Sequence, residues 1–460
     1  MSILSGLSGQ VLLPGDEGYD THRRVWNAMV DRRPAVIARC ATPADVATAV
    51  RFARGNGLEI GVRCGGHGVL GFAVPAGGLM IDLSPLGGVT VDPDRRRARV
   101  QGGALLGALD RATQPYGLAT TAGNVSHTGV GGLTLGGGMG WLARQYGLAC
   151  DNVVSYQVVL ASGDTVRASE AENADLYWAL RGGGGNFGVV TEFEFLLHRT
   201  GTQALLTELY YTPDDAPKAL RGWRDLLADA PRRATLTAWA GTAGDWPHLP
   251  AELRGRPLAS VGYVWIGDPD AGRGLLDQVS AVAPPAAERM RSLSYLDLQT
   301  MDDNPQGHQW RRYSKGYFLR DLTDDALDAF LSRGAEPGED PARLPGAGFQ
   351  AYGGAIAEIA PDETAFGHRD TLVEFSAGTR WADPAEDEWR TAAARRYGAA
   401  MEPHASGAYV NNVTDEGAVG RAYRADQLTR LAAVKDRYDP DNAFRLNHNI
   451  RPASAAVPSP

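Results

Sequence analysis

The stretch Arg63-Cys64-Gly65-Gly66-His67-Gly68 decides how this chain is interpreted. It ends an alternating run, residues 58–63, that predicts a half-buried strand. Its glycines let the backbone turn tightly, so that amide N–H groups can converge on an anion. His67 adds a nucleophilic ring to that turn. The stretch therefore predicts one of two things. Either it binds the phosphates of a cofactor through backbone amides and bonds to that cofactor through His67, or it is an ordinary turn with a solvent-facing histidine.

The bulk composition indicates a globular enzyme rather than a nucleic-acid or membrane protein. The chain has 460 residues and a formal net charge of −9, which disfavours a nucleic-acid surface. Its three cysteines, Cys40, Cys64 and Cys150, form neither a disulfide framework nor a paired metal-ligand spacing, so no metal site is predicted. We find neither a signal-peptide pattern nor an apolar run of about 18 residues, so we expect a cytoplasmic protein without a membrane span.

The N-terminal part predicts alternating strands and helices. Residues 35–63 indicate a strand, a helix and a second, parallel strand, with Thr42, Pro43 and Asp45 at the helix start. The pattern predicts further strands over 79–83, 153–160, 164–168 and 188–197, a hairpin over 89–102, and helices over 104–113 and 173–181.

After about residue 199 the pattern becomes that of a sheet covered by helices. Apolar strands are predicted over 205–211, 235–240, 258–265, 349–358 and 371–376, and helices over 215–229, 271–282, 324–333 and 424–437. The fold class expected is therefore α+β.

Two glycine-rich runs do not fit the common nucleotide-binding motifs. Gly183, Gly185 and Gly188 have the G-x-G-x-x-G spacing, but a helix precedes them and a strand follows, which excludes the Rossmann arrangement. The run over 129–140 has no Walker lysine. Close approach of this backbone to a flat or charged ligand explains the second run, and a flexible surface loop is the alternative.

Five segments together resemble the berberine-bridge-enzyme-like branch of the vanillyl-alcohol-oxidase flavoproteins, which have a PCMH-type FAD-binding fold. They are residues 63–68, the strand end Ile81-Asp82-Leu83-Ser84, the run over 122–140 with 146–153, the run over 181–193, and the C-terminal segment over 438–450. The resemblance implies a two-part FAD-binding domain, residues 1–198 and 405–455, with an inserted substrate-binding domain, residues 199–404, built on an antiparallel sheet.

The resemblance also implies the cofactor site. His67 falls on the histidine that bonds to the flavin 8α carbon, whereas Val125 stands at the position of a second, cysteine link, so one covalent link to FAD is expected. Thr128 and Leu133 fall near flavin C4a, where oxygen access is controlled. His127 is interpreted as an ordinary loop histidine. The cofactor-binding residues expected are Arg63, Cys64, Gly65, Gly66, His67, Gly68, Thr121, Gly123, Asn124, Thr128, Gly131, Gly132, Leu133, Gly138, Tyr146, Gly147, Val190, Asn447 and Asn449.

Candidate catalytic residues come from the later part of the chain. Hydride transfer to the flavin needs a base for the other proton. Tyr409 matches the family's Tyr-x-Asn motif, whose tyrosine often serves as base; packing on the flavin is the alternative. Tyr352 and Glu358 would share one face of the strand over 349–358, although a carboxylate at a strand end is usually just solvated.

The resemblance implies an FAD-dependent oxidase that takes a hydride from a small organic molecule, a secondary metabolite or sugar-like alcohol, and passes electrons to O₂. The alternatives are a flavin-dependent dehydrogenase or cyclase without O₂ turnover, and a non-catalytic flavin-binding protein.

Overall fold

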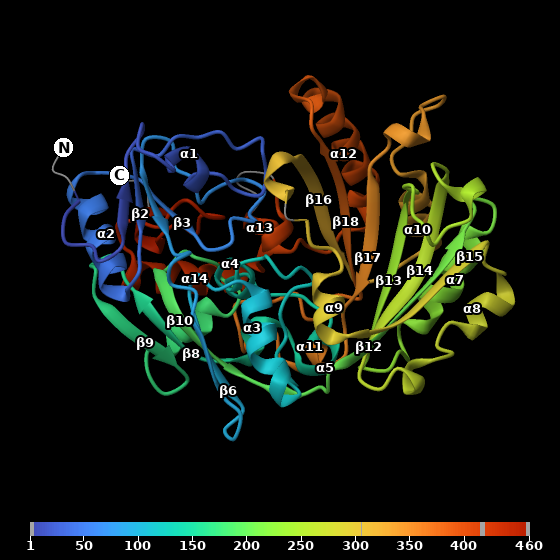
Figure 1. Cartoon of the computed structure of the whole chain (residues 1–460), viewed down its shortest axis with the longest axis horizontal. Helices are drawn as coiled ribbons and strands as arrows, with labels where there is room; N and C mark the ends of the chain where they lie inside the picture. The colour runs from blue at the N-terminus through green and yellow to red at the C-terminus, as the bar shows by residue number, and fades with distance from the viewer. Residues whose placement is uncertain (1–3, 305, 415–418, 457–460) are drawn as a thin grey trace.

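The computed structural model describes residues 4–304, 306–414 and 419–456. Residues 1–3, 305 and 415–418, which belong to the three predicted domain parts, lie outside the described residues, as do residues 457–460. Within the described residues the fold is mixed α+β, as predicted, with sheets at both ends of the molecule (Figure 1). No helix in the described part is long and apolar enough to cross a membrane.

A small sheet and the helix beside it position the His67 loop. The order is β1-β2-β4-β3, and β2 and β3 both run parallel to β4, which lies between them. The helix α2 begins as predicted. The Thr42 hydroxyl accepts a hydrogen bond from the Asp45 backbone amide, and the Asp45 carboxylate accepts one from the Thr42 backbone amide. The bounds are β1 (Gln10–Leu12), α1 (Tyr19–His22), β2 (Val36–Arg39), α2 (Pro43–Gly55), β3 (Ile60–Arg63) and β4 (Leu79–Asp82).

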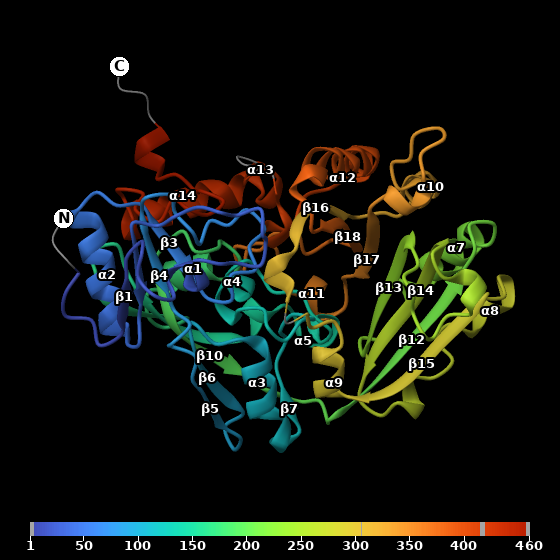
Figure 2. The ribbon, with the colours of Figure 1, turned by 45° about the horizontal axis from the view of Figure 1, so that its top comes forward.

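A second, antiparallel sheet has the order β5-β6-β10-β8-β9. Its apolar side chains pack against α3, α6 and the C-terminal α14, so that a late segment of the chain lies against the early ones (Figure 2). The bounds are β5 (Val89–Asp92), β6 (Arg97–Gln101), α3 (Leu106–Thr113), β7 (Leu118–Ala119), α4 (Val130–Leu135), α5 (Ala143–Tyr146), β8 (Val153–Val159), β9 (Thr165–Ser169), α6 (Ala174–Leu180), β10 (Val189–Leu196), β11 (His198–Arg199), α13 (Val419–Ala422) and α14 (Ala425–Tyr438).

The largest sheet is antiparallel throughout, with the order β15-β12-β14-β13-β17-β18-β16. One face buries an apolar core under α7, α8, α10 and α12. The opposite face packs partly on α5 and α9, at the junction with the rest of the molecule (Figure 2). The bounds are β12 (Gln203–Tyr211), α7 (Ala216–Leu226), β13 (Ala234–Thr242), β14 (Pro257–Ile266), α8 (Asp277–Val282), β15 (Ala287–Ser294), α9 (Tyr295–Thr300), β16 (Arg311–Leu319), α10 (Asp324–Ser332), β17 (Gly346–Ala351), α11 (Ala355–Glu358), β18 (Val373–Trp381) and α12 (Asp387–Met401).

One sequence expectation is wrong in detail. The predicted strand over 349–358 stops at Ala351, because Gly353 and Gly354 take positive φ values of 77° and 56° and the chain then turns into α11. Within the glycine run over 129–140, residues 130–135 form the short helix α4.

Candidate functional site

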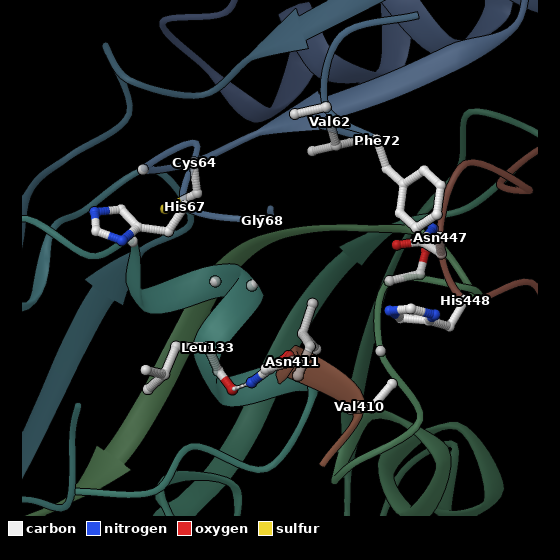
Figure 3. A pocket seen from close by; sticks show the side chains of 18 of the residues that line it. Val62, Cys64, His67, Gly68, Phe72, Leu133, Val410, Asn411, Asn447 and His448 are labelled. Carbon is white, nitrogen blue, oxygen red and sulfur yellow. Dashed lines mark hydrogen bonds between the residues drawn. The ribbon is translucent and has the colours of Figure 1, made fainter. Parts of the chain in front are cut away.

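A cavity of about 500 Å³ lies where the small sheet, α4 and the C-terminal segment meet. Figure 3 shows His67 at one end of this cavity, and Phe72, Asn447 and His448 at the other. Its wall consists of residues from the loop after β3, from α4 and the turns beside it, from the Gly184–Val190 stretch, and from 409–413 and 444–448. Segments far apart in the sequence therefore build one elongated site.

Glycines give this cavity its width. The backbones of Gly65 and Gly129 approach each other so closely that neither has room for a side chain: a Cβ on Gly65 would lie 2.3 Å from the Gly129 amide nitrogen. Gly68 and Gly132 line the cavity too, yet a Cβ on either would meet no heavy atom within 4 Å, and neither has a positive φ. Neither packing nor backbone strain requires glycine at these two positions. Glycine at Gly68 and Gly132 therefore keeps cavity space free of side chains, which a bound ligand could occupy.

His67 sits in a cluster of rings at one end of the cavity. Its ring stacks on Trp26 with a centroid distance of 4.7 Å and an interplanar angle of 14°. Its Nε2 lies 2.8 Å from His127 Nδ1, and its Nδ1 lies 3.4 Å from Thr128 Oγ1. Burial, together with the nearby His127 and Arg312, lowers the pKa of His67 to about 3. The ring is therefore neutral at physiological pH, which is the nucleophilic form.

The structure brings eleven of the expected cofactor-binding residues together in the cavity wall: Cys64, Gly65, Gly66, His67, Gly68, Thr128, Gly131, Gly132, Leu133, Val190 and Asn447.

The other expected cofactor-binding residues do not line the cavity. Arg63 pairs with Asp82 at 3.3 Å, and Tyr146 stacks on His198. Most of the rest hold neighbouring segments: the Thr121 hydroxyl donates to the Gly147 carbonyl at 2.7 Å, and the Asn124 amide donates to Gln350 Oε1 at 3.1 Å. The residues outside the wall are Arg63, Thr121, Gly123, Asn124, Gly138, Tyr146, Gly147 and Asn449.

The three candidate catalytic residues fall in three different environments. Tyr409 lines the cavity, but its hydroxyl accepts from the Gly138 amide at 2.8 Å and the Met139 amide at 3.2 Å. Burial raises the pKa of Tyr409. Tyr352 is buried and donates to Glu374 Oε2 at 2.8 Å. Glu358 does not join them: it lies on α11, its side chain is 56% exposed, and it forms an ion pair with Arg232.

Glu374 is the acidic residue that the sequence analysis missed. It lies on β18 between apolar neighbours, and its carboxylate accepts from the Tyr352 hydroxyl and the Asn412 side-chain amide. Asn412 in turn lines the cavity. Burial raises the pKa of Glu374 to about 7, although both hydrogen bonds oppose the shift. A lone carboxylate inside an apolar strand is the sequence signal that could have found it.

The register places Glu374 in a row of polar side chains. Gln350 on β17 is directly opposite Glu374, and Thr237 on β13 is directly opposite Gln350, so all three point to the same face of the sheet. Gln350 and Thr237 are half-buried. Because Asn124 and Asn412 also contact this row, it faces the cavity side of the molecule.

Other wall residues were also missed. Trp26 comes from an irregular N-terminal segment, and Phe72 and His448 form an edge-to-face pair with a centroid distance of 5.6 Å. Trp26 and Phe72 belong to no motif with a fixed spacing, whereas His448 lies within the C-terminal segment over 438–450 but was not chosen as a site residue. No cluster of three metal-ligating side chains occurs among the residues described.

Comparisons with known proteins find similar chains over nearly the whole length. The model for an FAD binding domain matches residues 34–169, and the model described as berberine and berberine like matches residues 408–451. The chain is 31% identical to (R)-6-hydroxynicotine oxidase of Paenarthrobacter nicotinovorans, over 97% of both chains.

Solved structures show the same fold. The crystal structure of 6-hydroxy-D-nicotine oxidase from Arthrobacter nicotinovorans gives a TM-score of 0.85 at 29% identity, over 97% of this chain and 98% of that one. Glucooligosaccharide oxidase from Acremonium strictum, described with a 6-S-cysteinyl, 8α-N1-histidyl FAD, gives 0.84 at 25% identity, over 96% and 97%.

Proposed function

The chain belongs to the berberine-like family of FAD-linked oxidoreductases, and on that premise we propose that it oxidises a small organic substrate with an FAD bound covalently through His67. The substrate carries an alcohol or a related group, as secondary metabolites and sugars do. It gives a hydride to flavin N5, and O₂ takes the electrons to form H₂O₂.

The covalent link is supported by the environment of His67. Because Nε2 is engaged with His127, Nδ1 is the ring nitrogen left beside Thr128 and the cavity. The neutral ring supplies a lone pair for bond formation. Val125 has no thiol, so a second link of the cysteinyl kind has no partner at that position.

The cofactor supplies the two-electron chemistry, and the protein positions the substrate and takes its proton. We assign the proton acceptor to Glu374. It is the buried carboxylate of the polar row, its pKa of about 7 suits a general base at neutral pH, and Asn412 connects it to the cavity wall. Tyr409 is a weaker choice, because its hydroxyl oxygen is already held by two backbone amides.

Electron transfer to O₂ is favoured by the names of two relatives, (R)-6-hydroxynicotine oxidase and glucooligosaccharide oxidase. Leu133 and Thr128 both line the cavity, and the Leu133 carbonyl accepts from the Asn411 side chain at 3.0 Å, which fixes this part of α4 (Figure 3).

The experiment is an anaerobic substrate screen of the purified yellow protein. Alcohols, amines and sugars are mixed with it, and bleaching of the flavin absorbance marks a substrate; admitting air should restore the colour and release one H₂O₂ per substrate. Bleaching without prompt recovery in air would instead identify a dehydrogenase. A flavin that no candidate reduces would contradict the proposal.

A further inference from the structure

His127 is one residue before Thr128 in the turn that leads to α4, and both of its ring nitrogens have partners. Nδ1 lies 2.8 Å from His67 Nε2. Nε2 lies 3.9 Å from Asp303 Oδ1 and 3.3 Å from the Asn304 backbone amide. The ring also contacts Trp26, with a centroid distance of 4.7 Å. His127 is thus inserted between the predicted nucleophile and a carboxylate from the other half of the molecule.

Asp303 is held in place independently of His127. Its Oδ1 accepts from the Ser126 amide at 3.0 Å, and its Oδ2 accepts from the Ser126 hydroxyl at 2.5 Å. These bonds come from the residue next to His127 in sequence. The carboxylate is therefore fixed beside the His127 ring, where it stabilises a positive charge on that ring.

We propose that His127, oriented by Asp303, takes the proton from His67 when His67 becomes attached to the flavin. This inference rests on the covalent link of the proposed function. In this arrangement His67 Nε2–H donates to His127 Nδ1, and His127 Nε2–H points to Asp303. In the structure the Asn304 amide donates to His127 Nε2 at 3.3 Å, whereas Asp303 Oδ1 lies 3.9 Å from that nitrogen, beyond hydrogen-bond distance. Taking up the proton therefore requires the His127 ring to exchange the Asn304 contact for a charge-assisted bond to Asp303.

The step balances as follows. His67 Nδ1 forms a bond to the C8 methyl carbon of FAD, that carbon loses one proton to solvent, and the proton on His67 Nε2 passes to His127 Nδ1. The flavin is left reduced by two electrons, which O₂ then accepts with two protons as H₂O₂. Without an acceptor at Nε2, the attached ring would keep a positive charge.

Arg312 makes the acceptor necessary. Its guanidinium lies 3.9 Å from the centre of the Trp26 ring and donates to the carbonyls of Trp26, Gly307 and Trp310. Among the described residues no carboxylate lies within ion-pair distance of it. Burial and the Arg312 charge lower the pKa of both His67 and His127, but only His127 has the Asp303 carboxylate beside it, so a proton is held better on His127 than on His67.

The test follows covalent loading in the full chain purified from cells starved of riboflavin. Excess FAD is added in air, samples are quenched in acid, and intact mass gives the fraction of polypeptide carrying flavin. His127→Ala and Asp303→Asn should load at least tenfold more slowly than the wild type, whereas the control His308→Gln should load at the wild-type rate. Added imidazole should speed His127→Ala, because it can occupy the space left by the ring.

The outcomes separate this proposal from the one on which it rests. A wild type that never retains flavin in acid removes the covalent link itself. A wild type that loads, with His127→Ala loading equally fast, overturns the role of His127. Slow loading that imidazole does not restore, accompanied by weaker reversible FAD binding in a fluorescence titration, shows that His127 only shapes the cavity and also overturns the proposal.

Discussion

Replacing Glu374 by Gln tests the buried carboxylate without any knowledge of the substrate. Gln has nearly the same shape, and the Asn412 amide can turn so that both hydrogen bonds are kept. The folded protein raises the pKa of Glu374 from 4.5 to about 7, which corresponds to about 3.4 kcal/mol at 1.36 kcal/mol per pH unit. Because the folded state holds this proton more tightly, its stabilising effect is complete below about pH 4.5 and is lost as the pH rises to 7.

The measurement is urea unfolding of wild type and Glu374→Gln at pH 5 and pH 8, followed by tryptophan fluorescence. From pH 5 to pH 8, the free energy of unfolding of the wild type should fall by about 2–3 kcal/mol relative to that of the variant. Glu358→Gln serves as the matched control, because that carboxylate is exposed and its replacement should change stability by less than about 0.5 kcal/mol at either pH. If the wild type and Glu374→Gln differ in free energy of unfolding by the same amount at pH 5 and at pH 8, the reasoning is refuted.

Three further substitutions test other parts of the site. Gly132→Val should lower flavin content at least tenfold, measured by absorbance, while circular dichroism stays unchanged, because a Cβ there meets only the cavity; normal flavin content would contradict this. Tyr409→Phe should destabilise the fold by about 1–3 kcal/mol in urea, since two backbone amides lose their acceptor, and should slow flavin reduction less than tenfold. A hundredfold slower reduction would make Tyr409 the base. Asp151→Asn should cost about 3–5 kcal/mol in the same assay, because Asp151 holds the buried Arg369 at 2.7 and 2.8 Å; an unchanged midpoint would argue against a buried pair.

Local patterns predicted most of the fold. The periodicity of residues 216–226 and 425–438 and the capping sequence at Thr42 led to helices with nearly the observed bounds, because these signals lie within one element. The order of strands was less accessible. β4 separates the parallel strands β2 and β3, an arrangement set by pairing between distant segments and not by the segments themselves.

The site was predictable where one motif carries several functions, as in residues 63–68, and not where distant segments meet. Trp26 and Glu374 have no spacing rule relative to His67, and only the folded chain reveals their neighbours. Glu358 was misplaced because a strand was extended through Gly353 and Gly354, whose positive φ values end it. His127 was taken for an ordinary loop residue because its contact with His67 depends on the fold.

Peptide mapping of the acid-precipitated protein tests the covalent flavin at His67 most directly. Trypsin should release residues 64–95 as one peptide, which holds His67 as its single histidine together with Cys64. We predict that this peptide carries one FAD bonded to His67 in fragmentation spectra, and that His67→Ala precipitates colourless. Flavin that stays entirely in the acid supernatant of the wild type, or that is found on another peptide, would contradict this.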